Sequence, residues 1–594
     1  MIVPMKRIFL LCVAEGTEHT LEVLRDLGAV HLELTAETGE ASVMAREDLE
    51  KAERAVRIIL KAAKEMEKTQ GDAPSHAGDA VADVVDAVLA LDARREELKG
   101  EAEALKATVR RYEPFGDFDP VLAARLSSAG VRLQLHDDGS FEFLYGEDEP
   151  AERPGVHLLT LPAERLSVTQ ARLSKAEAEI VALTAKIAAV DAEGIIKAFP
   201  ALQDAVAFAE AKDEMSANRF VDEKLTAGVA PQIAMVRGWI AEDGVSVLQK
   251  AAKGNGWGIA LRDPNPDETP PTLIRPPKLF RPVKVLFEGL GIAPAYTEAD
   301  VSVPFMCYFS LFFAMLVGDG GYGAIILALT LWGWRKYRAG KKPAPLMRSW
   351  LILLTVFSSA TIAWGLLSNT WFGAGLPFAA EWPTVKWLSD PTYSNMMLLC
   401  FTIGASHLVL ARIWTGLCML NDRTCLSQFG WAGIVLFMYF VTNAIVGIFS
   451  GIPSWAYWMF GVSLVLVFGF TLKGNELKSR GIELGMLPLN IMSALGDIIS
   501  YVRLFAVGWA SVKVAQNFND MALGLMSASD SLWVRPLLAV ALVAVLLVGH
   551  GLNFAMAGLS ILVHAVRLNT LEFSNHKGIS WAGYAFHPFR RQQT

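Results

Sequence analysis

The sequence predicts a mixed fold class: N-terminal α/β lobes joined by an antiparallel coiled-coil arm, then a C-terminal all-α membrane domain with about eight transmembrane helices. Charge is divided unevenly between the two halves. Residues 1–300 carry 35 Lys and Arg against 51 Asp and Glu, whereas residues 301–594 carry 19 against 10. Heptad spacing in the first half and long apolar runs in the second complete the prediction. The chain of 594 residues is 53% hydrophobic, which excludes a disordered protein.

The N-terminal half, residues 1–282, is expected to be a cytoplasmic arm that alternates lobes with long helices. Its parts are a proximal α/β lobe at 1–40 and 230–263, coiled coils at 45–113 and 163–192, a distal lobe at 114–162, and a proline-rich linker at 264–282. Apolar residues recur every three or four positions in three segments, and turn-forming residues at 71–79 separate the first two. An ordinary helical regulatory domain has the same periodicity, so that alternative stays open.

The first residues could be read as a signal peptide, because Lys6 and Arg7 precede an apolar run at 8–14. However, Glu15 and Glu18 follow at once, and the pattern continues as strand, helix and strand. We therefore expect a buried first strand and a cytoplasmic N-terminus.

The C-terminal domain, residues 283–594, contains eight apolar runs that are candidate transmembrane helices. They lie at 303–317, 322–334, 350–372, 396–417, 431–449, 455–472, 487–514 and 534–567. The first two runs are short, so they can also form one kinked helix. The last two exceed the ~20 residues needed to cross a bilayer, which predicts strong tilt. With eight spans, the connections on the N-terminal side carry 13 Lys and Arg against two opposite, which places both termini in the cytoplasm.

Several classes of site are excluded. The chain has no Gly-x-x-x-x-Gly-Lys-Ser/Thr phosphate loop, so we expect no nucleotide chemistry. The acidic arm argues against nucleic acid as a partner. Five scattered cysteines, four of them in or beside apolar runs, predict neither a disulfide scaffold nor a metal site, and no cofactor is expected.

Four basic residues fall within the predicted spans: Arg412, Arg503, Lys513 and Arg567. A charge deep in a span is costly, so each is a candidate functional residue. Snorkelling to the interface explains Arg412, near the end of its span, and partly explains Lys513. It does not explain Arg503, which lies about midway along its run. Arg567 is intermediate, since its side chain can reach the inner interface.

The last two runs also carry polar residues in a pattern. One face of the eighth run, at 3,4,3,4,3 spacing, is formed by His550, Asn553, Ala557, Ser560, His564 and Arg567. The seventh run has polar residues toward both ends: Asp497 and Ser500 at one, and Gln516, Asn517 and Asn519 at the other. These residues indicate two aqueous accesses that meet near one fixed cation.

Four longer motifs occur in a fixed order. They are PTLIRPPKLFRPVKVLFEGLG at 271–291, GDGGYG at 318–323, SYVRLFAVG at 500–508 and HAVRLNTLEF at 564–573, with FHPF at 586–589. On these motifs and on its whole organisation, the chain resembles the membrane stator subunit of rotary V-type and archaeal-type ATPases. This family is called subunit a in eukaryotes and subunit I in prokaryotes.

The resemblance implies that a ring of small membrane subunits, each with one buried carboxylate, turns against this chain. Arg503 matches the family's essential arginine, which would keep the ring carboxylate ionised and separate two ion half-channels. Arg567, His564 and Glu572 match the eighth-span motif and are expected to line the inner half-channel. Additional channel-lining candidates are Asp497, Ser500, Gln516, Asn517, Asn553, Ser560 and Lys513. A structural turn and helix cap are expected from Gly318, Asp319, Gly320 and Gly321.

The resemblance also implies partners. These are a c/K ring of proteolipid subunits, peripheral-stalk E/G subunits bound by the arm, a central-stalk C/d subunit, the soluble A/B ATPase head indirectly, and membrane lipid. ATP chemistry would belong to other subunits, so the chain is expected to be a non-catalytic part of an ATP-driven translocase in a prokaryotic plasma membrane. The expected transported ion is H⁺, with Na⁺ as the alternative.

One position departs from the family pattern. Eukaryotic members have a glutamate ten residues before the eighth-span arginine, where this chain has Ala557, and Asp497 or Glu572 could take over its role. Two other functions stay open: an ion-coupled secondary transporter with a cytoplasmic sensor domain, and a non-transporting scaffold or receptor. A transporter usually shows internal repeats or helices broken in mid-membrane. A scaffold does not require an arginine in mid-membrane.

Overall fold

The computed structural model describes residues 2–35, 39–67, 81–145, 157–220, 233–340, 345–471, 485–526 and 535–591. The chain divides into two compact units. The arm unit comprises residues 6–262 and the C-terminal residues from 588, and the membrane unit comprises residues 1–5 and 263–587. The proline-rich stretch at 264–282 thus belongs to the membrane unit, where Thr272 is buried and bridges to Ala585.

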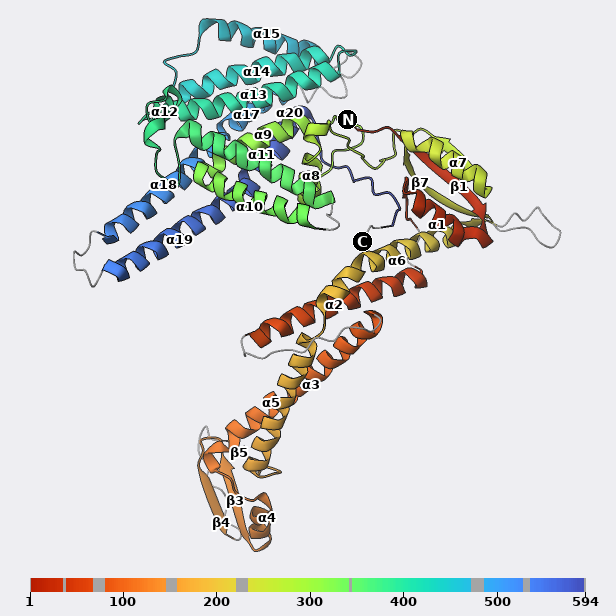
Figure 1. Ribbon diagram of the computed structural model, residues 1–594, viewed down its shortest axis with the longest axis vertical. Coiled ribbons are helices and arrows are strands. Elements are labelled where there is room, and N and C mark those ends of the chain that lie inside the picture. The colour runs from red at the N-terminus through yellow and green to blue at the C-terminus, as the bar shows by residue number, and fades with distance from the viewer. Residues whose placement is uncertain are drawn as a thin grey trace, which may run out of the picture. The chain divides into compact units, whose positions relative to one another are not determined.

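The arm unit contains a five-stranded sheet in which β2, β7, β1 and β8 are neighbours in that order, with β6 paired to β7. Its elements are β1 (Met5–Val13), η1 (Ala14–Gly16), α1 (Thr17–Leu27), β2 (Val30–Leu32), β6 (Arg219–Phe220), β7 (Ile233–Ala241), η3 (Glu242–Gly244), α7 (Val245–Asn255) and β8 (Gly258–Arg262). Leu10 of β1 pairs with Ile259 of β8 and is fully buried. Two strand–helix–strand segments from distant parts of the sequence therefore share one core (Figure 1).

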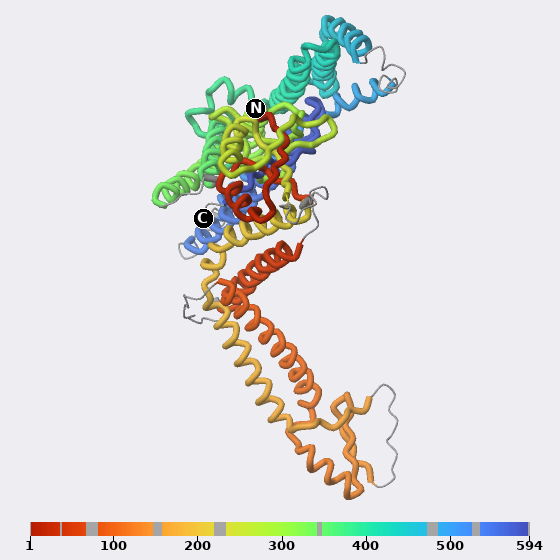
Figure 2. The backbone as a smooth tube through the Cα atoms, turned by 90° about the vertical axis from the view of Figure 1, so that its right-hand side faces the viewer, coloured from red at the N-terminus to blue at the C-terminus, as the bar shows by residue number. Residues whose placement is uncertain are grey.

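Four long helices of the arm unit pack in two pairs. They are α2 (Glu40–Glu67), α3 (Val81–Tyr112), α5 (Leu166–Ala188) and α6 (Ala192–Ala217). The helix α2 packs along α6, and α3 packs along α5 (Figure 2). The sequence patterns did not predict α6, which contains Pro200. The predicted break at 71–79 lies outside the described residues.

A small α/β lobe lies between α3 and α5 in the sequence. It consists of η2 (Glu113–Phe115), α4 (Pro120–Ser128), β3 (Val131–His136), β4 (Phe141–Tyr145) and β5 (Leu158–Leu159). The strand β3 is central, with β4 and β5 on either side. The side chain of Asp119 caps α4 by accepting a hydrogen bond from the amide of Val121, which fixes where that helix begins.

The membrane unit is helical. Its elements are η4 (Lys278–Phe280), α8 (Val283–Leu290), α9 (Ser302–Val317), α10 (Gly320–Ala339), α11 (Pro345–Ser368), η5 (Pro377–Ala379), α12 (Pro383–Leu388), α13 (Ser394–Cys418), α14 (Cys425–Ile445), α15 (Ser454–Phe470), α17 (Leu487–Ile499), α18 (Val502–Met526), α19 (Arg535–Ser560), η7 (Ile561–Ala565), η8 (Leu568–Phe573) and α20 (Ser574–Lys577). The helices α18 and α19 lie side by side (Figure 1). One core of aromatic and aliphatic side chains joins most of the unit.

The number of candidate spans is smaller than the sequence prediction. Among the described residues, five helical segments are long and apolar enough to cross a membrane. They are Met347–Ser368, Ser394–Cys418, Cys425–Ile445, Leu487–Leu525 and Arg535–Lys577. The pair α9 and α10 adds a sixth if it counts as one span, but it is bent by 119°. Within the described residues each of the eight predicted runs contains an α-helix, and α15 is apolar but shorter than a full span.

Candidate functional site

An ion pair between Arg503 and Glu572 joins the seventh predicted span to the helical segment Arg535–Lys577, which extends the eighth predicted span. The Nη2 atom of Arg503 donates a hydrogen bond of 2.6 Å to Oε1 of Glu572. The Glu572 side chain is 5% exposed and the Arg503 side chain 22% exposed. Nε of Arg567 lies 3.4 Å from the same oxygen, but this side chain is 56% exposed. Two guanidinium groups therefore share one carboxylate, which leaves a net positive charge at the site.

A break in the seventh span positions Arg503. The helix is interrupted at Ser500 and Tyr501, between α17 and α18. The amide of Leu504 donates to the carbonyl of Tyr501, so it does not use the carbonyl of Ser500 as a regular helix would. Nε of Arg503 donates to that Ser500 carbonyl over 2.9 Å. The break thus supplies a backbone acceptor that orients the guanidinium.

Two π-helical turns, η7 and η8, position the partners of Arg503 in the eighth span. A π-helical turn contains more residues than an α-helical turn, so the 3,4 spacing no longer keeps residues on one face. His564, Arg567 and Glu572 therefore do not continue the face that begins at His550. Among the described residues, Nδ1 of His564 and Oε2 of Glu572 are buried without a hydrogen-bond partner.

A second group of polar side chains lies beside Asp497. Nε2 of His576 is 3.0 Å from Oδ2 of Asp497, and Nε of Arg412 donates to Nδ1 of His576 over 3.1 Å. Nη1 of Arg412 donates to Gln428, and its guanidinium carbon lies 5.1 Å from the centre of the Trp431 ring. The interpretation of Arg412 as a snorkelling residue is therefore wrong, because its side chain is bound within the helix bundle.

A third group is built around Asn553, which is 1% exposed. Its amide donates to the hydroxyl of Tyr322 over 3.0 Å and to the carbonyl of Ser511 over 2.8 Å, and its carbonyl accepts from the Ser511 hydroxyl. His550 contacts both Tyr322 and Asn519, and Asn519 donates to the carbonyl of Phe372. The predicted candidate Asn553 thus connects α19 to α10 and α18. The candidate Ser560 lies apart and donates to Met556 in its own helix.

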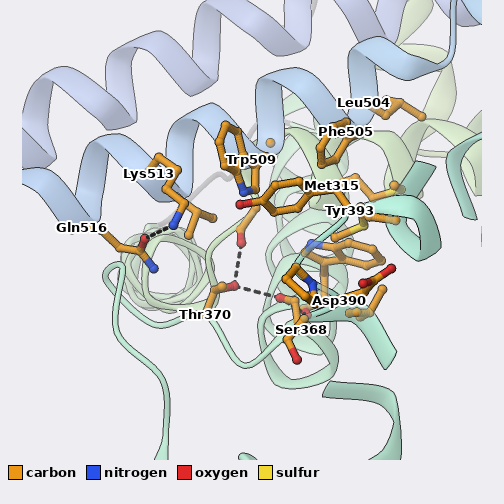
Figure 3. Close-up of a pocket in the computed structure, with 18 residues that line it drawn as sticks. Met315, Ser368, Thr370, Asp390, Tyr393, Leu504, Phe505, Trp509, Lys513 and Gln516 are labelled. Carbon is orange, nitrogen blue, oxygen red and sulfur yellow. Dashed lines mark hydrogen bonds between the residues drawn. The ribbon is translucent and has the colours of Figure 1, made fainter. Parts of the chain in front are cut away.

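A cavity of about 290 Å³ lies along α18 (Figure 3). Its lining follows one face of the helix from Leu504, the residue after Arg503, to Lys513 and Gln516. Nζ of Lys513 donates to Oε1 of Gln516 over 2.9 Å and lies near the ring of Trp509. Asp390 lines the same cavity, and its pKa is lowered to about 2 because Ser394 and Thr392 donate hydrogen bonds to it. The candidate Asn517 is exposed and does not line this cavity.

Asp319 of the GDGGYG motif is fully buried and binds three backbone amides. Oδ1 accepts from Gly321 and Phe372, and Oδ2 accepts from Gly373, over 2.7 to 2.8 Å. The first contact caps α10, and the other two hold the connection that follows α11. The motif therefore fixes the bend between α9 and α10 against a distant connection.

Ala557 lines a cavity of about 470 Å³ whose walls are almost wholly apolar. Phe313, Ile326, Leu351 and Phe554 are among its other lining residues. The position where eukaryotic family members have an acid thus faces apolar side chains in this chain. The nearest carboxylate along the same helical segment is that of Glu572, 15 residues later. In the described ranges, no group of three His, Cys, Asp or Glu side chains is arranged to hold a metal ion.

Two residues of these polar groups, His576 and Tyr322, were not among the residues predicted from the sequence. His576 lies four residues after Glu572, a helical spacing that places the two on neighbouring turns, and this signal could have been followed. Tyr322 is the tyrosine of the GDGGYG motif, but its partner Asn553 is 231 residues away. No local pattern links those two positions.

Known proteins are similar to this chain over its full length. V-type ATP synthase subunit I 1 of Treponema pallidum is 28% identical to this chain over 635 aligned residues, with both chains covered completely. V-type ATP synthase subunit I of Borreliella burgdorferi is 26% identical, again with complete coverage of both. The chain is a homologue of V/A-type ATP synthase subunit I.

Archaeal subunit I proteins are also similar. A-type ATP synthase subunit I of Methanocaldococcus jannaschii is 24% identical over 72% of this chain and 64% of its own length. No family model matches the chain. The family predicted from the motifs agrees with the names of these full-length relatives, and the apolar helices agree with a membrane protein.

Proposed function

We propose that this chain is the membrane stator subunit of a rotary V/A-type ATPase. It forms two ion half-channels against a rotating ring and couples ATP hydrolysis or synthesis to movement of H⁺, or alternatively Na⁺. The observation that carries the proposal is the Arg503–Glu572 pair, in which a second arginine keeps the site positive although the carboxylate is bound. A net cation held between two spans is costly in a membrane, which argues for a functional role.

The geometry suits a passing carboxylate. An arginine has five N–H donors, and Arg503 uses Nε for Ser500 and Nη2 for Glu572. The remaining donors can bind a ring carboxylate through charge-assisted hydrogen bonds, which favour its ionised form. The ring site then releases its ion near Arg503. Arginine suits this task because it stays charged at any relevant pH, whereas a desolvated lysine can lose its proton.

The surrounding polar groups support two separate accesses. The cavity along α18 is lined from Leu504, the residue after Arg503, to Lys513 and Gln516, so we assign it to the outer half-channel. His564, Arg567 and Asp497 lie toward the other end and are assigned to the inner half-channel. An ion cannot pass directly between the two, because Arg503 repels cations at the point where they meet.

The arm unit is proposed to bind the peripheral-stalk E/G subunits, while the membrane unit meets the c/K ring and the C/d subunit. The helices of the arm unit are joined side to side by apolar contacts and by ion pairs such as Lys106–Glu177, at 3.1 Å. Paired helices resist bending better than single ones, which suits a stator under torque. The A/B head is reached only through the stalks.

The test uses the assembled complex in sealed vesicles, with ATP-driven ion uptake and ATP hydrolysis measured together. We expect Arg503→Ala to assemble and to show no uptake, whereas Lys386→Ala, at an exposed lysine paired with Glu381, transports like wild type. Dependence of wild-type uptake on Na⁺ identifies the ion. Uptake by Arg503→Ala near the wild-type rate contradicts the proposal. Transport by the purified chain alone supports the secondary-transporter alternative. Such transporters often have helices broken in mid-membrane, and the helix of this chain is interrupted at Ser500.

A further inference from the structure

We propose that Asp497, His576 and Arg412 form a positioning cluster that holds Glu572 at bonding distance from Arg503. The proposal rests on the proposed function, since it takes Arg503 as the residue that meets the ring. The three side chains come from α17, α20 and α13, which are far apart in the sequence. His576 is 4% exposed and Asp497 25% exposed, so their contact is shielded from solvent.

The hydrogen bonds determine the tautomer of His576. Arginine has only donors, so Nε of Arg412 must donate to Nδ1 of His576, at 3.1 Å. Nδ1 is therefore unprotonated, and the ring proton lies on Nε2. Nε2 in turn donates to Oδ2 of Asp497 over 3.0 Å. Donors and acceptors thus run in one direction from Arg412 through His576 to Asp497.

This arrangement makes His576 a positioning residue. A second proton on Nδ1 would face the N–H of Arg412. His576 therefore cannot bind a transported proton unless Arg412 moves away. Arg412 is itself held by Gln428 and by the Trp431 ring. The cluster therefore fixes geometry, and His576 does not relay protons.

The cluster is connected to both members of the Arg503–Glu572 pair. On the α17 side, the Ser500 hydroxyl donates to the carbonyl of Asp497 over 2.6 Å, and Arg503 donates to the carbonyl of Ser500. On the other side, α20 follows η8 without a gap, so His576 lies four residues after Glu572. A shift of either segment would change the distance between the two charged groups.

The position of the cluster has a physical reason. The break at Ser500 and the π-helical turns of η8 both lack the regular α-helical hydrogen bonds that fix side-chain directions. Side-chain anchors on each segment replace that support, and a functional pair needs such support to stay within a fraction of an ångström of its working geometry. Misplacement by about 1 Å can reduce a reaction rate by about 100-fold.

The test compares polar and apolar replacements in the assembled complex, with ATP-driven uptake and ATP hydrolysis measured in vesicles. Glutamine can accept from Arg412 and donate to Asp497, so we expect His576→Gln to keep uptake within about threefold of wild type. His576→Leu and Asp497→Leu should lower uptake by about tenfold or more while hydrolysis continues. The double variant should be no worse than either single variant, because both remove the same link. Ser359→Leu is the matched polar-to-leucine control, because Ser359 is exposed in α11 and its hydroxyl donates to the carbonyl of Thr355 in its own helix.

Each other outcome has a definite meaning. If His576→Leu transports like wild type while Arg503→Ala does not, the positioning cluster is refuted and the proposed function stands. If Arg503→Ala transports, the proposed function itself fails. Equal loss in His576→Gln and His576→Leu refutes a hydrogen-bonding role. If the leucine variants do not assemble, His576→Asn provides the test. Its shorter side chain keeps the contact with Arg412 and loses the contact with Asp497. Wild-type uptake by this variant overturns the proposal.

Discussion

A methyl group on Gly508 would lie 2.2 Å from the carbonyl oxygen of Met315, so α18 and α9 touch through their backbones at this level. Gly318 contributes from the other side: its φ is +71°, and a methyl group there would lie 3.0 Å from the carbonyl oxygen of Gly508. The motifs GDGGYG and SYVRLFAVG therefore pack directly against each other. Arg503 lies little more than one helical turn before Gly508, so this contact also sets the position of the arginine.

Gly508→Ala should consequently destabilise the membrane unit. The added methyl group must push two backbones apart, and overpacking of this kind costs about 1–3 kcal/mol. We expect a lower unfolding temperature of the purified complex and weaker ATP-driven uptake. Gly551→Ala, in α19, is the control because its new methyl group meets open space. Equal unfolding temperatures for the two variants would show that α18 and α9 do not touch.

Glu572→Gln and Arg567→Gln should differ strongly, although both remove a charge from the same group. Glu572 is buried between two guanidinium groups, and breaking a buried ion pair costs about 3–5 kcal/mol because the remaining charge stays uncompensated. Arg567 is more than half exposed, so its pair contributes about 1 kcal/mol or less. Thermal unfolding and uptake, measured together, should both be impaired in Glu572→Gln. A larger loss of thermal stability in Arg567→Gln than in Glu572→Gln would contradict the geometry.

Asp319→Asn should lower the stability of the membrane unit even though the two side chains have the same shape. The carboxylate accepts three backbone hydrogen bonds, one of them on Oδ2 from Gly373. Asparagine has a single acceptor oxygen, so an NH₂ group would face the Gly373 amide and leave a buried donor unpaired at a cost of about 1–3 kcal/mol. The yield of assembled complex and its unfolding temperature check this. Asp520→Asn, at an exposed position in α18, should change neither.

Asn553→Leu should destabilise more than Tyr322→Phe. The leucine removes three hydrogen bonds, one to Tyr322 and two to Ser511, whereas the phenylalanine removes only the hydroxyl between His550 and Asn553. Each lost hydrogen bond costs about 0.5–1.5 kcal/mol. Ser560→Ala, which breaks only a bond within its own helix, should be close to wild type. The reverse order of unfolding temperatures would place Asn553 outside the network.

The sequence was sufficient for the features that depend on local chemistry. Hydropathy located the apolar helical segments of the membrane unit, because a helix in lipid needs a continuous apolar run. The cost of a charge in lipid distinguished Arg503 from its neighbours. The same approach misjudged Arg412, since distance from the end of a span does not reveal that His576 and Gln428 approach from other helices. It also missed α6, whose apolar pattern is less regular.

What the sequence determined by itself is therefore the division into an acidic half and an apolar half, the apolar helical segments and the resemblance to subunit I. Only the tertiary structure decided which polar residues meet. Arg503 and Glu572 are 69 residues apart, and their contact needs both the break at Ser500 and the π-helical turns of η8. Periodicity assumes an unbroken α-helix, so it cannot place side chains beyond such a break. The pairing depends instead on how several helices pack around it.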